Sequence, residues 1–124
     1  MNGVKALTFD LFGTVIDIAG SLRPAIDTFV KNHGVEISSD KFWEQWRERQ
    51  RFEQFQDTLL NLGHCGYMTA VRRALKNVFV ANGLDCASVE FESLMAAWRE
   101  LRPFSDTAAA MERLGSRYRL VVLS

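Results

Sequence analysis

The apolar run Val4–Phe9 ends abruptly in an acidic residue, Asp10, and this transition constrains the fold more than any other feature. An apolar run without alternation is typical of a buried parallel strand, and open α/β sheets bind ligands beyond the carboxyl ends of such strands. Gly13 allows the backbone to turn tightly, and Thr14 can donate a hydrogen bond back to Asp10. We therefore predict a strand that delivers a carboxylate to the edge of an α/β sheet.

A second apolar run, Tyr118–Leu123, predicts another strand. Between the two runs, apolar residues recur at helical spacing, and capping residues and helix breakers divide them into five segments. We expect Ser21, Ser88 and Ser105 to cap three of these helices. The five predicted helices run from Ser21 to His33, from about Ser38 to Leu60, from Met68 to Asn82, from Ser88 to Leu101, and from Ser105 to Gly115.

This order of elements predicts an α/β fold in which the two strands and the last helix form a parallel, right-handed crossover. Residues 1–18 and 103–124 would form a partial Rossmann-like core, and residues 19–102 an inserted helical cap domain. Strands of this kind need cover on both faces and neighbours on both sides. We therefore expect the N-terminal part of a longer protein; a short product that completes its sheet with a partner is the less favoured alternative.

Composition excludes several classes of partner. Fifteen basic residues balance fifteen acidic ones in 124 residues, so the chain has no general electrostatic attraction for nucleic acid or an anionic membrane. Cys65 and Cys86 are too few for a disulfide framework and fit no zinc motif. From the early Asp10 and the short apolar runs, we expect neither a signal peptide nor a membrane-spanning segment. We expect a cytoplasmic protein, and a homodimer remains possible.

An acidic residue at the end of a strand is a nucleophile, a metal ligand or a cap of the following turn. For a lone aspartate the structural cap is the usual role. Here that interpretation is weakened, because Phe9 precedes Asp10 while Gly13 and Thr14 follow at specific offsets.

These residues resemble a known family. The stretch Phe9–Asp17 is similar to the first motif of the haloacid dehalogenase superfamily, and Pro103–Ser124 is similar to the approach to its second motif, whose serine or threonine ends a strand. The helical insertion resembles the cap domain of that superfamily. Its phosphatases place a second aspartate two residues after the nucleophile, but this chain has Phe12 there. A phenyl ring cannot donate a proton, so the chain resembles the L-2-haloacid dehalogenase (type II) branch, in which an aromatic residue occupies that position.

The resemblance extends to the segment Trp46–Gln50. It is similar to the dehalogenase segment whose arginine reaches into the active site, which makes Arg47 a candidate to balance the substrate charge or receive the halide. An ordinary solvated helix face with ion pairs is the alternative. The charged residues that would form such a face are Glu44, Arg47, Glu48, Arg49, Arg51 and Glu53.

The resemblance implies covalent catalysis, without a metal, on a small-molecule anionic substrate. Asp10 would attack the halogen-bearing carbon of a 2-haloacid, halide would leave, and water would hydrolyse the resulting ester. Thr14 would orient Asp10. Ser124 and the backbone amides of Leu11 and Phe12 would hold the substrate carboxylate as fixed donors.

The superfamily also uses a lysine and acidic residues from a third and a fourth motif, which are absent from this chain. We therefore expect the 124-residue chain alone to be inactive or nearly so, and whether it is an enzyme by itself stays uncertain. Two alternatives remain open. One is a phosphatase-like enzyme that acts on a small phosphate ester with Mg²⁺, and the other is a non-catalytic truncated product that binds a partner.

Overall fold

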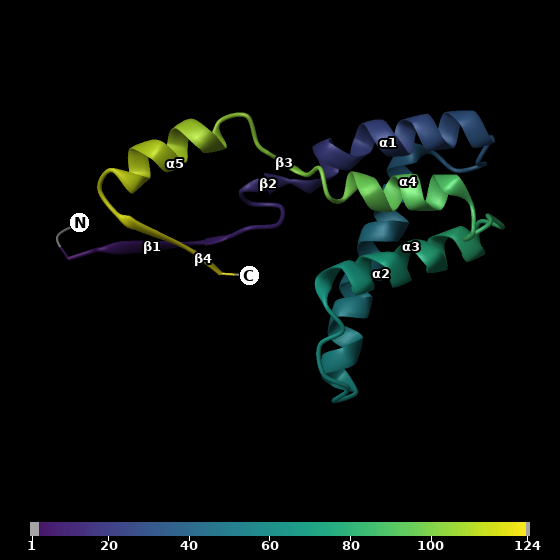
Figure 1. The fold of residues 1–124 in the computed structure, drawn as a ribbon, viewed down its shortest axis with the longest axis horizontal. Helices are drawn as coiled ribbons and strands as arrows, with labels where there is room; N and C mark the ends of the chain where they lie inside the picture. The colour runs from purple at the N-terminus through teal and green to yellow at the C-terminus, as the bar shows by residue number, and fades with distance from the viewer. Residues whose placement is uncertain (1–2, 124) are drawn as a thin grey trace. The chain divides into compact units, whose positions relative to one another are not determined.

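The computed structural model describes residues 3–123, which belong to two compact units (Figure 1). The chain up to Ser21 and the chain from Glu100 onward form the first, here called the core unit. Leu22–Arg99 form the second, the helical unit. None of the helices in the described residues is long and apolar enough to cross a membrane.

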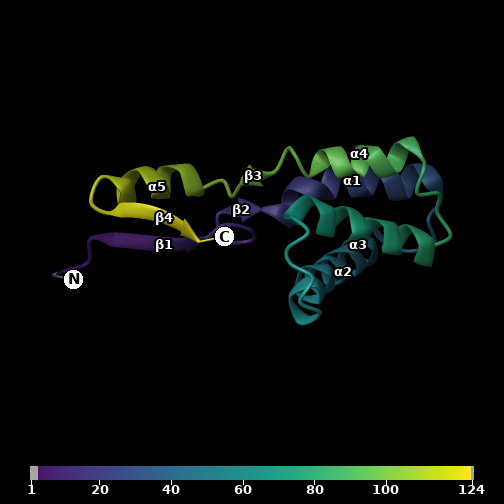
Figure 2. The ribbon, with the colours of Figure 1, turned by 60° about the horizontal axis from the view of Figure 1, so that its bottom comes forward.

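The core unit contains the predicted parallel pair of strands. Strand β1 (Ala6–Asp10) lies beside β4 (Arg119–Leu123), and the register places Asp10 opposite Leu123. Helix α5 (Thr107–Gly115) precedes β4 and packs against it, as both ribbon views show (Figures 1 and 2). The parallel α/β arrangement is therefore confirmed.

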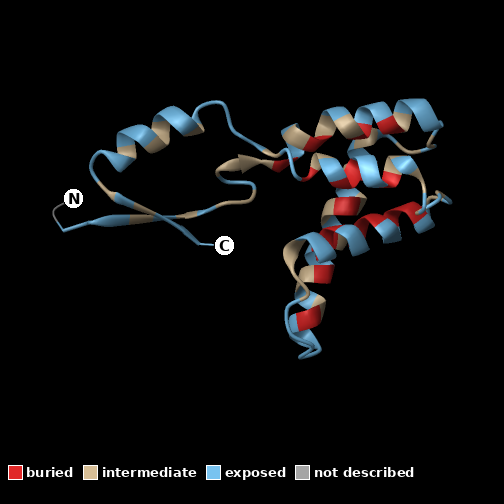
Figure 3. Cartoon of the chain, in the orientation of Figure 1, coloured by how far each residue is buried: buried red, intermediate tan, exposed pale blue. Residues whose placement is uncertain are grey.

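The sheet is less buried than the apolar runs predict. Along β1, Leu7 and Phe9 are half-buried while the alternate residues are exposed, and Val122 and Leu123 in β4 are largely exposed (Figure 3). Within residues 3–123, these two strands pair only with each other. The alternation of exposed and half-buried residues along β1 indicates that the described residues cover only one face of this sheet.

A small antiparallel pair was not predicted. Strand β2 (Ile16–Asp17) pairs with β3 (Arg102–Pro103), and Phe104 donates its backbone N–H to the Val15 carbonyl at 3.2 Å. This pairing corrects the fourth predicted helix. Helix α4 (Val89–Ala97) ends before Leu101, because the chain that follows turns and extends into β3.

The first helix, α1 (Ile18–His33), begins earlier than predicted, and Ser21 is not its N-cap. Asp17 fills that role, because its Oδ1 accepts the Gly20 N–H at 2.8 Å, the bond that an N-cap makes to the third helical residue. The Ser21 hydroxyl instead donates to the Asp17 carbonyl and accepts the Arg102 N–H at 2.8 Å. Ser21 thus ties the start of α1 to β3.

The helical unit contains most of α1 together with α2 (Ser39–Leu59), α3 (Tyr67–Ala81) and α4. Two predicted N-termini are confirmed, since the hydroxyls of Ser38 and Ser88 accept backbone N–H groups three residues on, at 3.2 and 3.3 Å. In α5 of the core unit, the N-cap position is Asp106 rather than Ser105, and no side-chain bond caps it.

The core of the helical unit is built around four phenylalanines, one from each helix. Phe79 of α3 lies 5.4 Å from Phe29, 6.2 Å from Phe42 and 5.1 Å from Phe91, measured between ring centroids. Trp46 adds a buried hydrogen bond from its indole Nε1 to the Val71 carbonyl at 3.1 Å. Almost all the buried side chains of residues 3–123 lie in this unit (Figure 3).

Candidate active site

The candidate nucleophile lies at the carboxyl end of β1. Asp10 is exposed, and its Oδ2 accepts a hydrogen bond of 2.7 Å from the Thr14 hydroxyl. This is the bond that the sequence predicts. A hydrogen bond to an ionised carboxylate is stronger than one between neutral groups, so it fixes the orientation in which the second carboxylate oxygen is presented.

The backbone after Asp10 forms a tight loop that brings Thr14 back to the carboxylate. The Leu11 carbonyl accepts two N–H groups, from Val15 at 3.0 Å and from Ile16 at 2.9 Å. Gly13 donates to the Ile16 carbonyl at 3.0 Å and has a φ of +94°. Residues with a side chain rarely adopt this φ, which explains the glycine at this offset.

Two other predicted site residues, Leu11 and Phe12, are half-buried in this loop, and Phe12 also forms a β-bridge with Ile16. Their backbone amides follow directly after Asp10 in the chain, as the predicted role in anion binding requires. The predicted residue Ser124 lies outside the described residues. Leu123, the last residue described in β4, is the register partner of Asp10.

Arg47 lies on α2 in the helical unit and is half-buried. Its guanidinium donates to the Oε1 of Gln50, a fully buried side chain. Both residues also interact with the hydroxyl of Tyr67. Burial raises the pKa of this hydroxyl overall, while the interactions with Gln50 and Arg47 act in the opposite direction. A guanidinium has five donors, so Arg47 keeps donors for an anion. Because Asp10 and Arg47 belong to different units, their approach to one another stays a prediction.

The alternative interpretation of α2 as a face with ion pairs applies to other residues. Lys41 pairs with the exposed Glu44 at 3.2 Å, as on a solvated face. Arg49 pairs at 2.6 Å with Glu53, but Glu53 is buried, so the expectation that it lies on a solvated face is wrong. Sequence reasoning missed Gln50, although its position three residues after Arg47 puts the two side chains on one face of a helix. No sequence spacing indicates Tyr67 as a neighbour of Arg47, because Tyr67 belongs to another helix, α3.

The residues described also bear on metal binding. Among residues 3–123, no three His, Cys, Asp or Glu side chains lie close enough together to hold a metal ion. The chemistry that the geometry itself offers is a carboxylate, oriented by a hydroxyl, at the end of a parallel strand.

Comparison with known proteins agrees with this geometry. No family model matches the chain. An (S)-2-haloacid dehalogenase of Pseudomonas sp. (strain YL) is 28% identical over 125 residues, which cover 100% of this chain and 51% of that protein. One from Pseudomonas fluorescens is 27% identical over 114 residues, 92% of this chain and 47% of its own length. A crystal structure of a dehalogenase matches 100% of the chain and 52% of its own, with a TM-score of 0.81 and 25% identity. The chain is haloacid dehalogenase-like in sequence and in fold.

The haloacid dehalogenase-like chain spans about half the length of the curated relatives it matches. The resemblance that Phe9–Asp17 indicates is confirmed, as is the parallel α/β fold class.

Proposed function

We propose that this chain carries the nucleophile of a hydrolytic dehalogenase that acts on small 2-haloacids. The observation that carries the proposal is the hydrogen bond between Thr14 Oγ1 and Asp10 Oδ2 at the end of β1. It is supported by the similarity to (S)-2-haloacid dehalogenases along most of the chain.

In the proposed reaction, a carboxylate oxygen of Asp10 attacks the halogen-bearing carbon from the side opposite the halogen. A carbon–oxygen bond forms, the carbon–halogen bond breaks, and halide leaves with the bonding electron pair. The product is an ester between Asp10 and the acid. Water then attacks the carbonyl carbon of that ester, which releases the 2-hydroxy acid and restores Asp10 with one oxygen from water. Thr14 holds the other carboxylate oxygen during the attack.

Phe12 fits this reaction, because halide departs without a proton whereas a phosphate ester needs a general acid near this position. The amides of Leu11 and Phe12, with Ser124, would bind the substrate carboxylate, and Arg47 would balance its charge. The proposed reaction needs no metal. We also propose a cytoplasmic location, in keeping with the free thiols of Cys65 and Cys86.

The chain alone should attack but not turn over. Since it spans about half of its relatives, we expect no more than about one halide released per chain, with an ester left on Asp10. The test is to incubate concentrated chain with 2-chloropropionate, measure halide, and locate the ester by mass spectrometry of peptides. A panel of phosphomonoesters with Mg²⁺ is run in parallel.

Three variants make the test specific. Asp10→Asn should form no ester and release no halide. Thr14→Val should slow ester formation by about 10- to 100-fold, because a hydrogen bond to a charged group contributes about 1.5–3 kcal/mol. Thr8→Val, at an exposed position in the same strand, is the control and should react normally.

The competing functions give different results. Halide release by Asp10→Asn at the rate of the unaltered chain would refute the proposal. Phosphate release without halide release would favour the phosphatase. A chain that reacts with neither substrate class but captures a partner would favour the non-catalytic alternative.

A further inference from the structure

The loop that carries Thr14 is held at both of its ends by one downstream segment of the chain. At the start of the loop, Asp10 lies opposite Leu123 in β4. At its end, β2 pairs with β3, where Ile16 lies opposite Pro103. Helix α5 joins β3 to β4, and both ribbon views show β3 beside β2 and β4 beside β1 (Figures 1 and 2). The loop is therefore closed by contacts from a distant part of the sequence.

The anchor at the end of the loop includes a side chain. The Val15 carbonyl accepts the backbone N–H of Phe104 at 3.2 Å and the hydroxyl of Thr107 at 3.3 Å, a bond that spans 92 residues of sequence. A carbonyl oxygen has two lone pairs, so it can accept both donors. The hydroxyl of Thr107 is a donor that a substitution can remove without changing the backbone.

Thr107 is well placed to act on the loop. It is the first residue of α5, it is half-buried, and its own N–H donates to the Phe104 carbonyl at 3.1 Å. A threonine in a helix can return its hydroxyl to a carbonyl of the preceding turn, as Thr28 of α1 does with Pro24 at 2.9 Å. Thr107 donates to another segment instead. Its hydroxyl therefore contributes to the position of the loop rather than to its own helix.

Val15 transmits this contact to Thr14. Both peptide groups of Val15 are hydrogen-bonded, because its N–H and that of Ile16 donate to the Leu11 carbonyl at 3.0 and 2.9 Å, while its own carbonyl accepts the two donors described above. Thr14 precedes Val15 and is exposed, so the backbone on either side sets its place. Its hydroxyl reaches Asp10 Oδ2 at 2.7 Å, and a displacement of about 1 Å would take these two atoms beyond hydrogen-bond distance.

We propose that Thr107 is a positioning residue for the carboxylate of Asp10. It acts through Val15: the hydroxyl of Thr107 holds the Val15 carbonyl, the held backbone places Thr14, and Thr14 orients Asp10. The inference rests on the proposed function, because the orientation of Asp10 affects a reaction only if that carboxylate attacks the substrate. It adds to that function a side chain from α5, outside the segment that carries Asp10 and Thr14.

A merely structural role for Thr107 leads to a different expectation. If its hydroxyl only stabilised the core unit, removing it would lower the free energy of unfolding and leave the reaction of the folded molecules unchanged. A positioning role changes the folded state around Asp10, and its effect depends on Thr14. Two measurements separate these cases, namely the environment of the Asp10 carboxylate and the rate of ester formation on it.

The first measurement is the ¹³C resonance of the Asp10 carboxyl carbon in the whole 124-residue chain, which requires no turnover. Thr14→Val removes the hydroxyl that bonds the carboxylate and defines the full displacement of the resonance. Thr107→Val should move the resonance in the same direction by at least about a third of that displacement, because the Thr14 bond is weakened rather than removed. Thr107→Ser keeps a hydroxyl and should leave the resonance near its original position.

The second measurement is the rate of ester formation with 2-chloropropionate in a single turnover. Thr107→Val should slow it by about 3- to 10-fold, the effect of losing one hydrogen bond between neutral groups. In a Thr14→Val background the same change should alter the rate by less than about 1.5-fold, because residues that act through one another have non-additive effects. Thr107→Ser should react within about twofold of the unaltered chain. Thr107→Ala repeats the loss of the hydroxyl with a smaller side chain and should react as slowly as Thr107→Val.

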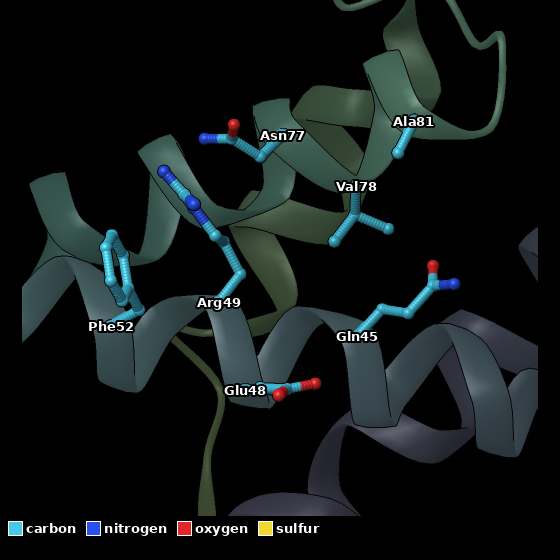
Figure 4. Close-up of a pocket in the computed structure, with 7 residues that line it drawn as sticks. All are labelled: Gln45, Glu48, Arg49, Phe52, Asn77, Val78 and Ala81. Carbon is cyan, nitrogen blue, oxygen red and sulfur yellow. The ribbon is translucent and has the colours of Figure 1, made fainter.

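Two controls remove comparable bonds in the helical unit. Thr28→Val removes a threonine hydroxyl that donates to a backbone carbonyl within α1. Asn77→Leu removes an amide that donates to the Arg73 carbonyl at 2.9 Å, beside the pocket between α2 and α3 (Figure 4). Neither change should move the Asp10 resonance or the rate of ester formation, and circular dichroism should show unaltered helix content for every variant.

The outcomes separate this inference from the function on which it rests. If the unaltered chain forms no ester, the proposed function fails, and the resonance still decides whether Thr107 positions Asp10. If the ester forms, the positioning role is overturned by a rate in Thr107→Val equal to that of the unaltered chain, or by the same slowing with and without the Thr14 hydroxyl. An Asp10 resonance that stays in place in Thr107→Val would overturn it in either case.

Discussion

Replacing Phe79 by alanine should remove most of the stability of the helical unit. Phe79 is 1% exposed and touches a phenylalanine from each of the other three helices, at 5.1–6.2 Å between ring centroids. Truncating a buried phenylalanine costs about 3–5 kcal/mol, as the sum of the transfer free energy of the removed atoms and the cavity left behind. Because Phe79 packs on three other rings, we expect a cost near the top of this range, about 4–5 kcal/mol. The free energy of unfolding of domains of this size is about 5–10 kcal/mol.

The assay is urea unfolding followed by tryptophan fluorescence, which reports on Trp46 in the same core. A loss of about 4 kcal/mol should lower the midpoint by about 2 M urea, for a denaturant dependence of about 2 kcal/mol per molar. Phe79→Leu keeps most of the volume and should cost about 1–1.5 kcal/mol. Measurements at low micromolar concentration keep any self-association from adding to the apparent stability.

Val80→Ala is the matched control, because Val80 adjoins Phe79 in α3 but is largely exposed. It should change the free energy of unfolding by less than about 0.5 kcal/mol. The reasoning would be refuted if Phe79→Ala cost less than about 1 kcal/mol, or no more than Val80→Ala. Either result would mean that the four helices do not share one cooperative core.

Two other predictions test local features. A Cβ on Gly20 would lie 2.1 Å from Asp17 Oδ2, so Gly20→Ala should displace the Asp17 cap and give no net increase in the free energy of unfolding. In an Asp17→Ala background, where no cap is lost, the same change should raise it by about 1 kcal/mol. Additive effects of the two changes on the free energy of urea unfolding would contradict this. The pKa of Asp57 is lowered, mainly by its hydrogen bond with the Cys65 side chain. The ionised carboxylate therefore stabilises the folded chain fully above the ordinary pKa of an aspartate, about 4. This contribution is lost as the pH falls through the lower pKa of the folded state. Asp57→Asn should therefore flatten the acid side of the stability–pH curve, and an unchanged slope would show that the carboxylate contributes nothing.

The parts of this structure that could be predicted from sequence depend on short-range signals. Ser38 and Ser88 are recognisable from sequence as helix starts, because their capping bonds reach only three residues along the chain. Asp10 and Thr14 are four residues apart, so the offset alone indicated the hydrogen bond. The two apolar strands were long enough to recognise, and their parallel pairing followed from the helix between them.

The errors come from interactions between distant segments. Ser21 and Asp17 are both good N-cap residues. In the structure the Ser21 hydroxyl accepts the backbone N–H of Arg102, which lies 81 residues further along the chain, and Asp17 forms the cap. The pair Ile16–Asp17 and Arg102–Pro103 is too short to leave a periodic pattern. Pro103 is predicted to stop the helix that starts at Ser88, but α4 already ends at Ala97 and Pro103 lies within β3, a strand that the proline does not indicate.

Helix α2 shows why the apolar content of a segment does not by itself predict its buried face. The sequence places its aromatic residues around a broad face, and the structure divides them into a buried half, with Phe42 and Trp46, and an exposed half, with Phe52 and Phe55. The division follows from polar residues that find partners inward, which spacing along α2 cannot reveal. Arg47 lies on the same helix and also faces partly inward, toward Gln50 and Tyr67. For Asp57 the inward partners are the Cys65 backbone N–H and the Arg73 guanidinium, both outside α2, so contacts that the periodicity of α2 does not contain decide which face is buried.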